Sequence, residues 1–223
     1  EPAFQRRIDG RGRAGRRCAP AWVAVRGLPG FSERDLPALR QVVIDVPTCA
    51  ASAADTVAIP AGPFVDGGAG EPPSQHARHA RSELQLALPA FRMDRTEVTN
   101  AAWRRFAAMA ALTGHGERVY AGAVEAAQAG RADHPVTQVD AEAAGAFCRF
   151  MGKTLPTSAQ WTKAARGGLS LADGRANLHP RRNLPWGVDP APGRANLGGE
   201  DDPIKGSAPV TAFGEDRSPY GVL

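Results

Sequence analysis

Apolar residues recur every three or four positions in three stretches of the chain, which predicts three helices that each pack by one face. The first helix should be capped by Thr96 or Thr99 and end before Gly114, because hydroxyl side chains favour helix starts and glycine favours helix ends. The second should begin after Asp140 and stop at Gly152. Its inward positions should be Ala143, Ala144, Phe147, Cys148 and Met151.

The third helix has a well-defined start signal. Thr157 and Gln160 form a capping box, in which each side chain can hydrogen bond with the backbone N–H of the other residue. Trp161 and Ala164 or Ala165 should then face inward. We therefore expect one aromatic core shared by the three helices, built from Trp103, Phe106, Phe147 and Trp161.

Strand patterns precede the helices. Residues 56–68 indicate two short strands bent at Pro60 and Gly62. The alternating leucines of residues 84–88 indicate a half-buried strand. After Gly168 the chain has almost no periodicity, so a long ordered loop is expected there.

The beginning of the chain differs from the rest. It has strand-like runs at 21–25 and 41–46, followed by an Ala- and Ser-rich stretch at 49–55 that is typical of a linker. We therefore expect residues 1–54 to form a basic N-terminal extension and linker, and residues 55–223 to form the main domain.

The composition agrees with a folded, turn-rich protein. Hydrophobic residues make up 43% of the chain, which is enough for a core, and Gly 25 with Pro 19 indicates short elements joined by irregular backbone. No run of about 18 apolar residues occurs, so no membrane span is expected. No secretory leader is visible either, although the chain begins with Glu1 rather than Met.

The net charge of +4 arises from arginines in the first 17 residues. Such a cluster could bind nucleic acid or could be a solvated chain end. No aromatic residues lie between the arginines to stack on bases, which favours the solvated end and no nucleic-acid partner.

Two groups of residues suggest metal sites, and each has a simpler explanation. An iron site could be formed by His76, His79 and Glu83 if they shared one face of a helix. Because two prolines precede these residues, a proline-rich loop with two solvated histidines is favoured instead. Residues 196–204 place an Asn amide, carboxylates and free carbonyls on non-helical backbone, which suits Ca²⁺. On composition alone, an acidic solvated turn is favoured there.

The cysteines do not form a metal-binding pattern. Cys148 lies on the apolar face of the second predicted helix, which favours a buried inert thiol. Cys18 and Cys49 could form a disulfide in an exported protein, and the sequence leaves that open.

Eight short segments, taken together and in order, resemble the formylglycine-generating enzyme (sulfatase-modifying factor) family. The resemblance runs from about Thr56 to the last residue. The segments are residues 59–64, 91–100, 134–136, 146–161, 164–168, 185–187, 195–197 and 208–210.

The resemblance implies an α+β, C-type-lectin-like (formylglycine-generating-enzyme) fold with little regular secondary structure. The family's enzymes oxidise a sulfatase cysteine, in a Cys-x-Pro-x-Arg motif, to Cα-formylglycine with O₂ and a copper ion held by two cysteines. Those cysteines lie in the family's C-terminal third, and this sequence ends before it, at Leu223. No catalytic or copper-binding residue is therefore assigned, and we expect the 223-residue chain alone to be inactive.

One site does carry over from the family. Its first calcium site corresponds here to the side chains of Asn196 and Asp202 and the carbonyls of Leu197 and Ile204. The resemblance thus implies a structural Ca²⁺, and calcium at modest affinity suits an exported protein in the periplasm or outside the cell.

The resemblance leaves more than one function open. The expected partner of an oxidase is a sulfatase or another protein or peptide substrate. The alternative is a non-catalytic module for an unknown ligand, because this fold is also appended to bacterial Ser/Thr kinases and surface proteins. A family member that uses iron with histidines would need a cluster that His76 and His79 do not supply.

Overall fold

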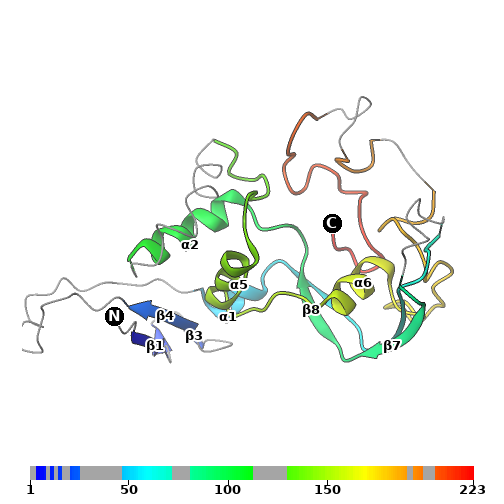
Figure 1. Cartoon of the computed structure of the whole chain (residues 1–223), viewed down its shortest axis with the longest axis horizontal. Helices are drawn as coiled ribbons and strands as arrows, with labels where there is room; N and C mark the ends of the chain where they lie inside the picture. The colour runs from blue at the N-terminus through cyan, green and yellow to red at the C-terminus, as the bar shows by residue number, and fades with distance from the viewer. Residues whose placement is uncertain are drawn as a thin grey trace, which may run out of the picture. The chain divides into compact units, whose positions relative to one another are not determined.

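The computed structural model describes residues 4–8, 11–12, 15–16, 21–25, 47–71, 81–112, 130–189, 193–197 and 204–223. These residues have an α+β architecture of short helices and two-stranded sheets (Figure 1). They divide into two compact units. Unit 1 combines Glu1–Ala54 with Val98–Leu155, and unit 2 combines Asp55–Glu97 with Pro156–Leu223.

Short antiparallel pairs form the first part of unit 1. Strand β1 (Phe4–Ile8) pairs with β4 (Ala21–Val25), which confirms the strand predicted at 21–25, and β2 (Arg11–Gly12) pairs with β3 (Gly15–Arg16). The strand-like run at 41–46 lies outside the described residues.

The predicted linker at 49–55 is wrong in its first part, because Cys49–Ala53 form the short helix α1. The hydroxyl of Thr48 accepts a hydrogen bond from the N–H of Ala51 at 3.1 Å and so caps the helix. Alanines favour a helix once a cap has formed. The Ala- and Ser-rich composition typical of a linker therefore forms a helix here, because Thr48 precedes it.

Unit 1 also contains two of the three predicted helices, α2 (Asn100–Leu112) and α5 (Ala141–Phe150). Thr99 caps α2, since its hydroxyl accepts from the N–H of Ala102 at 3.2 Å. Asp140 caps α5 through a 2.7 Å bond from the N–H of Ala143. Both predicted starts are confirmed, Thr99 being the capping threonine of the first.

An aromatic cluster joins α2 to α5. Trp103 is 1% exposed, and its ring centroid lies 5.2 Å from that of Phe106 and 5.6 Å from that of Phe147. Cys148, which is not in a disulfide, packs at the edge of this cluster. Trp161 was predicted to join it, and that prediction is wrong: its helix belongs to unit 2, and the residue is 65% exposed.

Unit 2 is built on a bent two-stranded ribbon. Strand β5 (Thr56–Ile59) pairs with β8 (Phe91–Asp94), and β6 (Gly62–Asp66) pairs with β7 (Leu84–Leu88). The register is the same on both sides of the bend, with Ile59 opposite Phe91 and Gly62 opposite Leu88. The ladder is interrupted between β5 and β6, where Pro60 lies, and between β7 and β8, where Pro89 lies. Proline has no N–H to donate to a ladder. The predicted bend is confirmed.

Helix α6 (Ser158–Arg166) packs on β6 of this ribbon (Figure 1). The predicted capping box is present, with a 3.2 Å bond to the hydroxyl of Thr157 and a 2.9 Å bond to the side-chain oxygen of Gln160. Ala164 packs against the buried Val57 and Ile59.

The residue of α6 that is buried deepest is Lys163, at 1% exposure. Its Nζ donates to the carbonyl oxygens of Pro60 at 2.6 Å and Gly62 at 3.0 Å. Lys163 therefore supplies donors at the bend, where the ribbon has lost its ladder hydrogen bonds.

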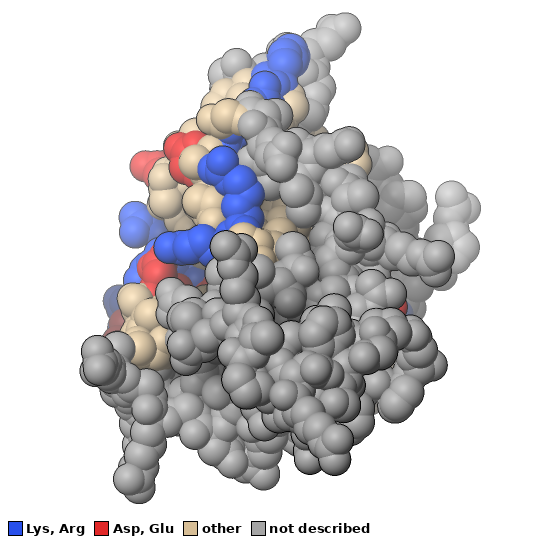
Figure 2. All heavy atoms as spheres, turned by 90° about the vertical axis from the view of Figure 1, so that its left-hand side faces the viewer, with Lys and Arg blue, Asp and Glu red and all other residues tan. Residues whose placement is uncertain are grey.

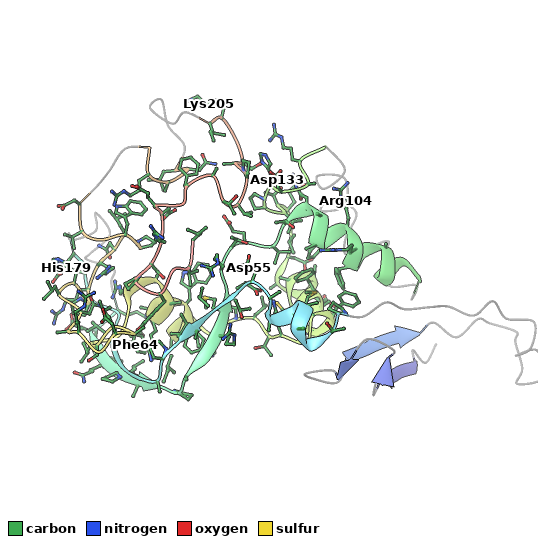
Figure 3. The ribbon with its side chains drawn as sticks, turned by 180° about the vertical axis from the view of Figure 1, so that it is seen from behind. Asp55, Phe64, Arg104, Asp133, His179 and Lys205 are labelled. Atoms are coloured by element: carbon green, nitrogen blue, oxygen red, sulfur yellow. The ribbon has the colours of Figure 1, made fainter. Side chains whose placement is uncertain are left out.

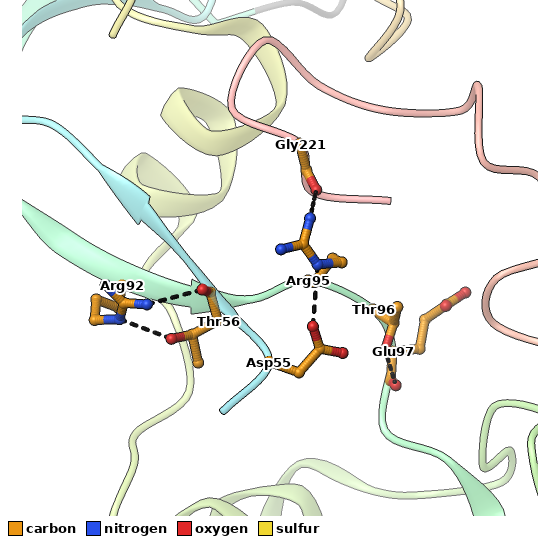
Figure 4. A network of polar contacts seen from close by, with 7 residues as sticks. All are labelled: Asp55, Thr56, Arg92, Arg95, Thr96, Glu97 and Gly221. Carbon is orange, nitrogen blue, oxygen red and sulfur yellow. Dashed lines mark hydrogen bonds and ion pairs between the residues drawn. The ribbon is translucent and has the colours of Figure 1, made fainter. Parts of the chain in front are cut away.

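The last residues of the chain return to the ribbon. The N–H of Leu223 donates to the carbonyl of Arg95 at 2.8 Å, directly after β8. The Arg95 side chain donates to Asp55 at 3.0 Å and to the carbonyl of Gly221 at 3.5 Å, while Arg92 donates to Thr56 (Figure 4). The hydrogen bonds of Leu223 and Arg95 therefore connect the last residues of the chain to the residues that border β5 and β8.

The described surface carries charges of both signs. On the face in Figure 2, Lys and Arg side chains lie among acidic and uncharged ones. Within the described residues, no helix is both long and apolar enough to cross a bilayer.

Candidate functional site

The structure describes the two ends of the predicted calcium segment. The side-chain N–H of Asn196 donates to the carbonyl of Gly206 at 2.8 Å, which links the two described ends of the segment. Leu197 and Ile204 are described, whereas Asp202 lies outside the described residues. The predicted ligand set stays a prediction.

The described residues do not test the other candidate metal site, because they include only one of its three members. His76 and His79 lie outside the described residues, and Glu83 forms a two-pronged ion pair with Arg181, with N–O distances of 2.7 Å. The hydrogen bond from Arg181 lowers the pKa of Glu83. Among the described residues, no group of three or more His, Cys, Asp or Glu side chains could hold a metal ion. Cys148 is the one cysteine whose side chain the structure describes, so a copper site on paired thiolates is not tested by the described residues.

A different feature is the best candidate for a binding site. A hollow of about 310 Å³ lies in unit 2, beside α6 and the end of β6. We call it the arginine hollow. It is lined by Gly67, Gly68, Arg81, Trp161, Thr162, Ala165, Arg166, Arg182, Asn183, Leu184 and Pro185.

Two glycines form one wall of the arginine hollow. Gly67 and Gly68 both have φ of +71°, a left-handed conformation that suits glycine. A side chain at Gly67 would also collide with the carbonyl of Ser82. The turn brings the carbonyl of Gly67 close to α6, where it accepts a 2.6 Å hydrogen bond from Arg166.

Arg166 is the last residue of α6, where a cation interacts favourably with the helix dipole. Besides Gly67, it donates to the side-chain oxygen of Asn183 at 3.4 Å. Burial lowers the pKa of Arg166, and the nearby charges of Asp66 and Glu83 act in the opposite direction. The guanidinium is thus poorly solvated, although it stays protonated.

Asn177 connects the end of α6 to the loop that carries Arg182. Asn177 is 7% exposed, and its amide N–H groups donate to the carbonyls of Arg166 at 3.0 Å and Gly168 at 2.8 Å. Its side-chain oxygen accepts from Arg182 at 2.7 Å. Arg182 also donates to the carbonyl of His179, a residue labelled in Figure 3. Burial lowers the pKa of Arg182 as well.

The chemistry of the lining favours binding over catalysis. Arg81 pairs with Asp66 at 3.3 Å, while Trp161 presents an exposed indole. Among the described lining residues there is no Cys, His or carboxylate, and so no side chain of the usual general-base types beside the hydroxyl of Thr162.

Local sequence patterns give little indication of the arginine hollow. Arg166 had a local signal, its position in the last turn of a helix. Arg182 and Asn177 had none, because their partners are defined only by the fold.

Comparisons with known proteins identify one matching family and several similar proteins. Residues 44–223 match the family described as "Sulfatase-modifying factor enzyme 1-like domain". The chain is similar to a hercynine oxygenase of Mycolicibacterium smegmatis, with 30% identity over 221 residues, which cover 87% of this chain and 49% of that protein. It is also similar to a formylglycine-generating enzyme of Bos taurus, with 39% identity over 89 residues, 37% of this chain and 22% of that protein.

A third relative has a different description. The chain is 37% identical over 96 residues to an inactive C-alpha-formylglycine-generating enzyme 2 of Mus musculus, covering 40% of this chain and 28% of that protein. The chain spans about half the length of the hercynine oxygenase, and the matches to the other two cover smaller shares.

Proposed function

Because the chain belongs to the sulfatase-modifying factor (formylglycine-generating enzyme) family, we propose that it is part of an O₂-dependent oxidoreductase that acts on a cysteine of a protein substrate. The observation that carries this proposal is the family match over residues 44–223. The relative named formylglycine-generating enzyme supports a sulfatase as the expected substrate.

We also propose the C-type-lectin-like fold of the family for this domain. Its support is the α+β content together with the loop after α6, which has few regular elements but many hydrogen bonds. In the full protein, residues 55–223 would contribute the scaffold, and the redox cysteine pair would come from elsewhere, since Cys148 is the single cysteine of residues 55–223.

The proposal predicts activity for the full-length protein with a Cys-x-Pro-x-Arg peptide, copper, a thiol reductant and O₂. The peptide should lose its cysteine sulfur and gain an aldehyde, as measured by peptide mass. The 223-residue chain alone should leave the peptide unchanged, because Cu(I) prefers a pair of soft thiolates. If the 223-residue chain alone converts the peptide cysteine to the aldehyde, the redox residues lie within this chain and the proposal is wrong.

A second candidate reaction has a specific observation in its favour. The similarity to the hercynine oxygenase covers 87% of 223 residues, about 194, whereas residues 44–223 number 180. The similarity therefore extends into residues 1–43. The same assay should include hercynine with Fe(II) as a parallel arm. If the full-length protein acts on neither substrate, the oxidoreductase proposal fails and the non-catalytic module is favoured, in line with the inactive relative.

We further propose that the domain holds a structural calcium ion between the side chains of Asn196 and Asp202 and the carbonyls of Leu197 and Ile204. The hydrogen bond from Asn196 to Gly206 supports this, since it links the two described ends of the segment and leaves the side-chain oxygen of Asn196 as an acceptor. Amide, carboxylate and carbonyl oxygens at about 2.3–2.6 Å are the ligands that Ca²⁺ prefers.

The calcium proposal predicts that chelation lowers the melting temperature of the protein. Asp202→Ala should abolish this response, because it removes the strong anionic ligand. Asp201→Ala is the matched control and should keep it. The measurement is a thermal melt with and without chelator, on a sample in which calcium has been quantified. An unchanged melt in a calcium-containing sample, or an equal loss of response in both variants, would contradict the site.

A further inference from the structure

We propose that the arginine hollow binds a small organic anion, whose carboxylate or phosphoryl group lies against Arg166 and Arg182 and whose flat apolar part lies against Trp161. This proposal is separate from the oxidoreductase activity, because no cysteine is among the described lining residues.

The charge around the hollow favours an anion. Three arginines line it, and no described carboxylate does. The two nearby acids already have cationic partners: Asp66 pairs with Arg81, and Glu83 pairs with Arg181. Arg166 and Arg182 make no ion pair with a described carboxylate, and the described oxygens that accept their hydrogen bonds are all neutral, although Asp66 and Glu83 lie near enough to act on Arg166.

The two guanidinium groups keep donors for a ligand. A guanidinium has five N–H groups. Toward the described residues, Arg166 uses two of them, on Gly67 and Asn183, and three remain. Arg182 uses three toward the same part of the chain, on His179, Pro185 and Asn177, and two remain. Planar guanidinium groups bind carboxylate and phosphoryl oxygens in pairs of hydrogen bonds, which suits these remaining donors.

The surroundings hold both arginines in place before any ligand binds. Buried Asn177 bonds both to the backbone of Arg166 and to the side chain of Arg182. The glycine turn supplies the carbonyl that holds Arg166. Side chains that are already ordered lose little conformational entropy on binding, so the two cations form a pre-organised pair.

Trp161 adds an apolar surface to the charged one. An indole that is 65% exposed is a large apolar group left in contact with water, and it lines the same hollow as Ala165, Leu184 and Pro185. The volume of about 310 Å³ lies at the lower end of the range for ligand pockets, roughly 300–1,000 Å³. The ligand should therefore be small, with one anionic end and one flat apolar end.

The test is calorimetric titration of the full-length protein with benzoate and with phenyl phosphate. Benzamide serves as the uncharged analogue of benzoate. Both anions should bind and benzamide should bind at least about tenfold more weakly, since hydrogen bonds between charged groups are stronger than neutral ones. The relative affinity of the two anions identifies the carboxylate or the phosphoryl group as the preferred head. Equal binding of benzamide and benzoate, or no binding of either anion, would overturn the proposal.

Variants separate this site from general attraction of anions. Arg166→Gln and Arg182→Gln should each weaken benzoate binding by roughly ten- to a hundredfold. Trp161→Ala, at an exposed position that should not disturb folding, should weaken it by about tenfold. Arg175→Gln is the matched control, because Arg175 is exposed, pairs with Asp173 and lies outside the lining. A loss in Arg175→Gln equal to that in Arg166→Gln, or unchanged binding in Trp161→Ala, would contradict the assigned site.

Discussion

Replacing Trp103 with alanine should lower the free energy of unfolding by roughly 3–5 kcal/mol, as large-to-small changes in cores do. Trp103 is 1% exposed and packs its ring on Phe106 and Phe147, so its removal leaves a cavity between α2 and α5. In a chain of this size the melting temperature should fall by on the order of 10 °C. Urea unfolding and thermal melts, followed by circular dichroism, measure the two quantities.

The same substitution at Trp161 is the matched control. Trp161 is 65% exposed, so Trp161→Ala should change the free energy of unfolding by about 0.5 kcal/mol or less, as exposed substitutions usually do. If the two variants lose equal stability, the assignment of Trp103 to the core and of Trp161 to the surface is wrong.

Lys163→Met should destabilise the protein by roughly 1–3 kcal/mol, the cost of leaving buried polar groups without partners. Methionine is close to lysine in length but cannot donate to the carbonyls of Pro60 and Gly62, which Lys163 contacts at 2.6 and 3.0 Å. Lys205→Met, at an exposed lysine, is the control and should have little effect. Equal losses in the two variants would contradict the role given to Lys163.

This effect should depend on pH. Burial lowers the pKa of Lys163 below its ordinary value of 10.5. In the alkaline range below that value, the unfolded chain therefore binds more protons than the folded one, and the stability of the folded protein rises with pH. The difference in stability between the wild type and Lys163→Met should thus be larger at about pH 10 than at about pH 7. A difference that shrinks with pH would mean that the amine is not desolvated.

The sequence predicted what depends on neighbouring residues. The capping box of Thr157 and Gln160 involves residues three positions apart, and Asp140 caps α5 in the same local way. The bend of the ribbon was also predictable, since Pro60 lacks the N–H that a ladder needs. These elements agree with the structure because their physical causes lie within a few residues.

The errors arose where distant partners decide burial. On α6, hydrophobic pattern alone favoured Trp161 as inward. The structure instead exposes Trp161 and buries Lys163, because the Lys163 amine finds acceptors 103 and 101 residues away at the bend. The arginine hollow was missed for the same reason: the turn at Gly67, the end of α6 at Arg166 and the loop at Arg182 meet only in three dimensions.

The bend of the ribbon also limits how this region can change in length. The pairings Ile59 with Phe91 and Gly62 with Leu88 keep one register across the interruption, so both strands pass through it with the same number of residues. An insertion or deletion of one residue in a single strand would shift one half of the ribbon against the other and turn its side chains to the opposite face. Phe64, which is fully buried in β6, would then lose its present packing. Length changes at this bend are therefore tolerable only in compensating pairs, one in each strand, and Pro60 and Pro89 mark where such a pair would occur.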